Sequence, residues 1–100
     1  MIRHIVMWRV RGANPEERAE ARRLIKSEFE SLRGRIPGLR HLEVGLDTSG
    51  VDYACDVVLF TEFDSQDALD AYARDPEHRR VRDKLSNVRI ARHQVDYIPE

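Results

Sequence analysis

The apolar residues of this chain recur at strand spacing in its first ten positions. Residues 2–10 alternate so that one face carries an unbroken apolar and aromatic row: Ile2, His4, Val6, Trp8 and Val10. Ile5 and Met7 make the middle of the opposite face apolar as well. A strand with two apolar faces is expected to be covered on both sides. The pattern therefore predicts a buried strand at the start of the chain.

Three further strands follow from the same period. Residues 41–46 alternate polar and apolar, which predicts a half-buried strand. Residues 54–63 are apolar on both faces, as in the first strand. Residues 88–98 form the last strand. Its apolar residues fall on even-numbered positions up to Ile90 and on odd-numbered positions from Val95. We expect a bulge near Ala91–His93 to restore the pairing.

One long helix is predicted between the first two strands. Asn14 is a capping residue, Pro15 fits the first helical position, and acids follow in the first turn. Gly34 is suited to end the helix. Its apolar stripe, which should face the sheet, consists of Ala21, Leu24, Ile25, Phe29 and Leu32.

Two short helices are predicted between the third and fourth strands. Asp64-Ser65 marks the start of the first helix, and Pro76 disfavours a helical conformation at Asp75. Asp75 can cap the second helix, with Pro76 at its first position. His78 then shares an apolar face with Val81 and Leu85, so its imidazole should point inward.

The order of elements predicts an α+β domain over residues 1–100: a split β-α-β-β-α-β arrangement with helices on one face of an antiparallel sheet. The second face of that sheet is also apolar. An apolar patch of that extent is unusual on a soluble monomer. We therefore expect a homodimer in which two sheets pack face to face about a two-fold axis.

Composition narrows the class of protein further. The formal net charge of −1 argues against a nucleic-acid partner bound through bulk charge. A single cysteine and the lack of a signal-peptide pattern indicate a cytoplasmic protein. No apolar run is long enough to cross a membrane, so no membrane partner is expected. No residue spacing indicates a metal site, and no cofactor is expected.

The charges are unevenly distributed along the chain. Residues 41–73 contain eight acids and no lysine or arginine, whereas residues 74–92 contain seven basic residues and three acids. One interpretation is that these charges lie on solvated faces. The other is that the basic segment attracts an anion to the start of the last helix.

Tyr72 and His78, on either side of the break at Pro76, are the candidate functional pair. The imidazole can act as a base and the phenol as a hydrogen-bond donor to a substrate carbonyl. Alternatively, the phenol bonds the imidazole or a backbone group and ties the two helices together. His4 and Trp8 lie on the face that these helices cover, and complete the candidate ligand-binding set. Alternatively, His4 is a core residue whose ring nitrogens are hydrogen-bonded within the protein.

The set of motifs resembles the stress-responsive A/B-barrel (Dabb) domain across essentially the whole chain. The matching segments are Ile2-Arg3-His4-Ile5-Val6, Ile36-Pro37-Gly38, Phe60-Thr61-Glu62-Phe63, Ala71-Tyr72 with Pro76-Glu77-His78, and Val95-Asp96-Tyr97. The resemblance implies a ferredoxin-like fold that dimerises into an α+β barrel. It agrees with the dimer expected from the two apolar faces of the sheet.

The functions implied by the resemblance are mixed. Many members are stress-linked proteins of unknown activity, and a plant branch cyclises polyketides by aldol condensation. In that branch, residues at the positions of Tyr72 and His78 carry the chemistry, and a histidine matching His4 lies nearby. This chain has Asp75-Pro76 where the family often has His-Pro, and an apolar residue near Val57 where the cyclase branch sometimes has a histidine.

The sequence therefore favours a small homodimeric protein with a cavity between sheet and helices, bordered by His4, Tyr72 and His78. The cavity binds a small, partly apolar molecule or serves a structural role. The alternative is an acid–base enzyme, similar to the polyketide cyclases, that uses Tyr72 and His78. A third class, a haem-dependent relative with His78 as ligand, is not singled out by any residue.

Overall fold

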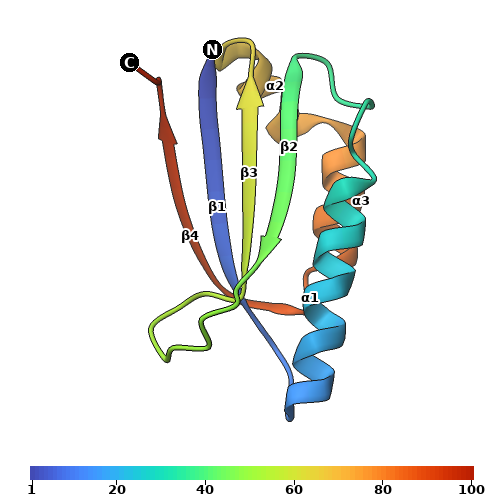
Figure 1. The fold of residues 1–100 in the computed structure, drawn as a ribbon. Helices are drawn as coiled ribbons and strands as arrows, with labels where there is room; N and C mark the ends of the chain where they lie inside the picture. The colour runs from blue at the N-terminus through green and yellow to red at the C-terminus, as the bar shows by residue number, and fades with distance from the viewer.

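A computed structural model describes residues 1–100 and shows one antiparallel sheet with three helices on one face (Figure 1). The elements are β1 (Ile2–Val10), α1 (Pro15–Glu30), β2 (Leu39–Leu46), β3 (Val57–Phe63), α2 (Gln66–Arg74), α3 (Pro76–Lys84) and β4 (Arg89–Tyr97). The strand order is β2-β3-β1-β4, so β1 and β3 are central and receive partners on both sides. The predicted α+β architecture is confirmed.

The core lies between the sheet and the helices. The even-numbered positions of β1 are all buried on this side, and they meet the apolar stripe of α1. Ile25, Phe29 and Leu32 are almost completely inaccessible to solvent. The side chain of Lys26 donates to the backbone oxygen of Val44, which anchors α1 across β2. No helix is long and apolar enough to cross a membrane.

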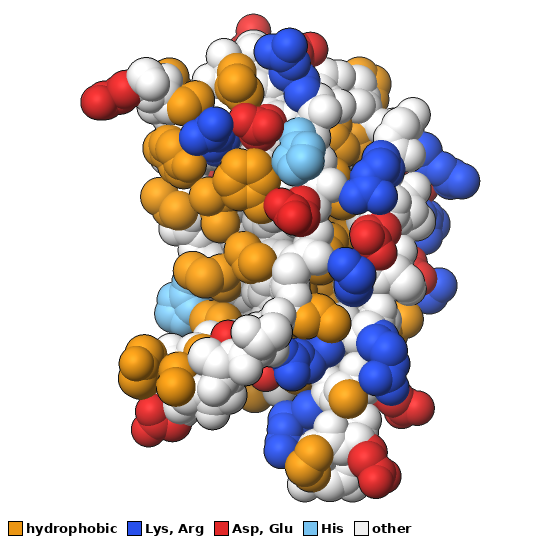
Figure 2. Space-filling view, in the orientation of Figure 1, with side chains coloured by type: hydrophobic (Ala, Val, Ile, Leu, Met, Phe, Trp, Pro, Cys, Tyr) orange, Lys and Arg blue, Asp and Glu red, His pale blue; other side chains and the backbone are white.

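No helix covers the opposite face of the sheet. Ile5 pairs with Phe60 on one side and with Val95 on the other, and Met7 pairs with Val58. Val95 is 50% exposed and Met7 is 37% exposed. Figure 2 shows hydrophobic side chains gathered over the strands on the side away from the helices. We call this surface, formed by Ile5, Met7, Val58, Phe60, Val95 and Tyr97, the outer face.

The start of β3 and the position of the bulge in β4 differ from the sequence prediction. β3 begins at Val57 rather than near Ala54, because the Asp56 carboxylate accepts the backbone N–H of Val10 in place of a strand carbonyl. The bulge in β4 is also displaced from the expected Ala91–His93. Arg9 pairs with Ala91 and Val10 pairs with Arg89, which leaves Ile90 as the extra residue.

Candidate functional site

The break between α2 and α3 positions the candidate pair. Asp75 has an extended backbone, with φ −66° and ψ 134°, and its side chain accepts the N–H of Glu77 at 2.8 Å. Asp75 thus ends α2 and caps α3, as its place before Pro76 predicts. Tyr72 lies in the last turn of α2 and His78 in the first turn of α3. Their ring centroids are 4.1 Å apart.

The contact between these two rings is apolar rather than hydrogen-bonded. The Tyr72 hydroxyl and His78 Nδ1 are both buried, and neither has a hydrogen-bond partner in the protein. The structure therefore lacks the phenol–imidazole bond, which is one of the two forms of the structural role given above for this pair. Each atom is thus an exception to the rule that buried polar groups are hydrogen-bonded.

His4 is held differently from His78. It lies on β1, is 7% exposed, and its Nδ1 lies 2.6 Å from a carboxylate oxygen of Asp96 on β4. Because the carboxylate accepts, Nδ1 carries the proton in this pair and Nε2 faces away from Asp96. The His4 ring also meets the Tyr72 ring edge-on, with centroids 6.3 Å apart. His4 is thus a partnered histidine that also lies in the wall of the site.

Trp8 forms the other end of the site. Its ring stacks on Phe29 of α1, with centroids 5.0 Å apart, and the Arg89 guanidinium lies 5.3 Å from the ring centroid. Its indole Nε1 is buried without a hydrogen-bond partner in the protein. Buried indole N–H groups usually have one.

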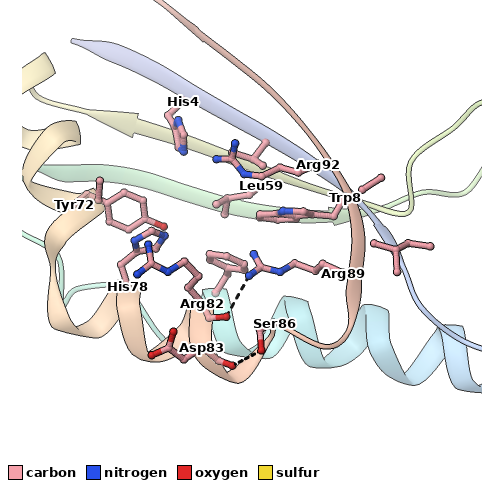
Figure 3. Close-up of a pocket in the computed structure, with 15 residues that line it drawn as sticks. His4, Trp8, Leu59, Tyr72, His78, Arg82, Asp83, Ser86, Arg89 and Arg92 are labelled. Atoms are coloured by element: carbon pink, nitrogen blue, oxygen red, sulfur yellow. Dashed lines mark hydrogen bonds between the residues drawn. The ribbon is translucent and has the colours of Figure 1, made fainter.

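These four residues line a single cavity of about 770 Å³ between the sheet, α2, α3 and the start of β4 (Figure 3). Val6, Leu59 and Phe29 supply its apolar wall. The structure thus brings together His4, Trp8, Tyr72 and His78, as the sequence predicts. A smaller hollow of about 220 Å³ adjoins it and is bordered by His4, Tyr72, His78 and Asp96.

Burial sets the protonation of the central pair. It raises the pKa of the Tyr72 phenol well above its usual range, so the phenol stays protonated at neutral pH. Burial, followed by the nearby Arg82, lowers the pKa of the His78 imidazole below its usual 6.5. At neutral pH the site therefore presents a hydroxyl donor beside a neutral imidazole. That is the protonation state required for a donor and a base.

Several residues of the site were not identified from the sequence. Three arginines (Arg82, Arg89 and Arg92) line the cavity, together with Asp83 and Ser86. The excess of basic residues over positions 74–92 was the available signal, but it does not show which side chains turn inward. No group of three or more histidine, cysteine, aspartate or glutamate side chains is placed to hold a metal ion.

Comparison with protein families gives a match over nearly the whole chain. The family model for the stress-responsive A/B barrel domain matches residues 2–99. The chain belongs to this family. A search of curated proteins found no match. Membership agrees with the segments around Tyr72, His78 and Val95 that indicate the same family in the sequence.

Solved structures show the same fold. A dimeric protein of unknown function with a ferredoxin-like fold from Bacteroides fragilis is 32% identical, with a TM-score of 0.84 over 96% of this chain and 93% of that one. A Dabb family protein from Mesorhizobium loti is 24% identical, with a TM-score of 0.78 over 99% and 96%. A hydroxynitrile lyase from Passiflora edulis is 14% identical, with a TM-score of 0.81 over 99% and 93%. The last two likenesses show the fold alone.

Proposed function

We propose that this protein is a homodimer in which each subunit binds a small, partly apolar molecule between the sheet and the α2–α3 break. The observation that carries the proposal is one cavity lined by three residues that each have a buried polar atom without a hydrogen bond. Trp8 Nε1, Tyr72 Oη and His78 Nδ1 all lack a partner in the protein. Buried polar groups are normally satisfied. Three unsatisfied polar atoms in residues that line one cavity suggest that the polar groups of a ligand bond to them.

The dimensions of the cavity support the same proposal. Its volume of about 770 Å³ lies within the range of small-molecule sites, roughly 300–1,000 Å³. Its apolar wall of Val6, Leu59 and Phe29 would contact the body of the ligand. An apolar lining with a few convergent polar groups is the usual composition of such sites.

The dimer is supported by the outer face and by the relatives. Ile5, Met7, Phe60 and Val95 form a continuous apolar surface that no helix of the subunit covers. The similar protein from Bacteroides fragilis is dimeric. A second copy placed on the outer face would bury this surface and leave both cavities, which lie on the helix side, open to ligands.

Acid–base catalysis is the second candidate function, because a neutral imidazole and a protonated phenol face the same cavity. His78 would take a proton from the carbon next to a substrate carbonyl, and Tyr72 would donate a hydrogen bond to the resulting enolate oxygen. The enolate carbon could then attack a second carbonyl of the same molecule. The new alkoxide would recover the proton from His78, so the ring closure is balanced.

A neutral methyl ketone, 2-acetonaphthone, tests both candidates. We expect the wild-type protein to bind it in calorimetry and His78→Ala to bind it several-fold more weakly. The matched control is Arg79→Ala, an exposed residue next to His78 that lies outside the cavity. Equal binding by wild type and His78→Ala would remove the proposed site. In D₂O, faster loss of the methyl proton signal with wild type than with His78→Ala would support catalysis.

A further inference from the structure

The bulge in β4 has a specific consequence for the cavity. In a regular strand, residues three apart lie on opposite faces. Arg89 and Arg92 are three apart, yet Arg92 pairs with Trp8 and Arg89 pairs with Val10, two residues on the helix-facing side of β1. The extra residue, Ile90, restores the parity, so both arginines lie on the side of the cavity. Bulges often redirect a side chain in this way near functional sites.

Arg82 on α3 approaches the same space from the opposite side. All three guanidinium-bearing residues line the cavity, and Figure 3 shows them between the His78 end and the Trp8 end. None of the three forms an ion pair with a carboxylate of the protein. Arg89 instead donates to the backbone oxygens of Leu85 and Arg82, at 3.4 and 3.3 Å.

Positive charge prevails in this part of the cavity. Asp83 is its one acidic lining residue, against the three arginines. Asp96 and Asp70 border the smaller adjoining hollow, where the two oxygens of Asp96 are bonded to His4 and Gln94. The mutual repulsion of the arginines contributes, after burial, to a lowered pKa of Arg89. An anion between them would relieve this repulsion.

We propose that the ligand is an organic acid: a ring-sized apolar body against Leu59, Val6 and Phe29, with its anionic group held by Arg82, Arg89 and Arg92. This inference rests on the proposed function and adds the charge of the ligand to it. At this end of the cavity the Arg89 guanidinium lies 5.3 Å from the centroid of the Trp8 ring. Guanidinium groups bind carboxylates through paired, charge-assisted hydrogen bonds. A free inorganic anion would leave the apolar wall without a contact, so an anion with an apolar body fits the cavity better.

Two ligands of the same shape and different charge test this inference. We use 2-naphthoate and its neutral amide, 2-naphthamide, with calorimetry on the full chain. We expect wild type to bind the acid about tenfold more tightly than the amide, since hydrogen bonds to a charged group are stronger. This preference should shrink as salt is added, because the cavity is open to solvent at the arginines.

Single substitutions test which arginines cause the preference for the acid over the amide. Arg89→Gln and Arg92→Gln should each weaken binding of the acid several-fold and weaken binding of the amide much less, so the ratio of the two affinities falls. Retained binding of the amide shows that the variants are folded. Arg79→Gln, exposed on α3 and outside the cavity, should change neither affinity. Equal affinities of wild type for acid and amide would overturn this inference and leave the proposed function intact. Failure of wild type to bind either compound would overturn both.

Discussion

The rings of Tyr72 and His78 lie 4.1 Å apart, centroid to centroid, but the phenol oxygen and the imidazole Nδ1 are not bonded to each other or to any other protein group. The α2–α3 break fixes this arrangement, since Pro76 ends one helix and Asp75 caps the next. No hydrogen bond between the two side chains therefore ties the helices together. Both side chains line the cavity that Trp8 also lines.

Removing the Tyr72 hydroxyl separates a binding role from a structural role. We expect Tyr72→Phe to unfold in urea with a free energy equal to wild type or higher by up to about 1 kcal/mol, because the deleted group has no protein partner. Binding of 2-acetonaphthone should weaken. A loss of about 1 kcal/mol or more in stability, with binding intact, would show that the hydroxyl ties the helices together.

The stability of the protein should depend on pH through His78. Burial lowers the pKa of this imidazole in the folded state, whereas the unfolded chain titrates near 6.5. Below about pH 6.5 the unfolded state binds the extra proton, so this contribution to stability is complete above that pH and is lost as the pH falls. Urea unfolding of wild type and His78→Gln on both sides of this pH measures it.

We expect the glutamine variant to lose less stability on acidification than wild type, because it has no imidazole to protonate on unfolding. NMR titration of the His78 ring should give a pKa below that of a free histidine. Identical pH dependence of unfolding in the two proteins would show that the imidazole is equally solvated in both states.

The outer face predicts the oligomeric state. Light scattering of wild type should give about twice the subunit mass of 11.7 kDa. Val95→Glu places a charge in the middle of the outer face, beside Ile5, and should shift the protein toward the subunit mass. Val51→Glu is the control, since Val51 is 40% exposed in the loop before β3. A monomeric wild type would contradict the proposed dimer.

Local sequence signals predicted the position of the pair. Pro76 after a helical repeat marks the break, and the spacing of His78, Val81 and Leu85 turns the imidazole inward. The apolar residues on both faces of β1 predicted an outer face that needs cover. These features depend on residues a few positions apart, where helix and strand periods apply directly.

The remaining parts of the site depend on long-range pairing. His4 and Asp96 are 92 positions apart and meet only because β1 pairs with β4. The inward position of Arg89 depends on the bulge at Ile90. In the sequence, the change in the alternation of apolar residues along the last strand gave only an approximate position for this bulge. The charge bias of residues 74–92 left two interpretations open, solvated faces or an anion, and it did not show the cavity that these arginines line.

The indole N–H of Trp8 provides the most direct measurement. Trp8 is the chain's single tryptophan, so its Nε1–H gives one resolved signal in a ¹H–¹⁵N NMR spectrum, and that group is buried in the cavity wall without a protein partner. Titration with 2-naphthoate should shift this signal, together with the His78 ring signals, along one saturable curve. An unmoved indole signal while residues elsewhere shift would place the ligand outside the cavity and contradict the account.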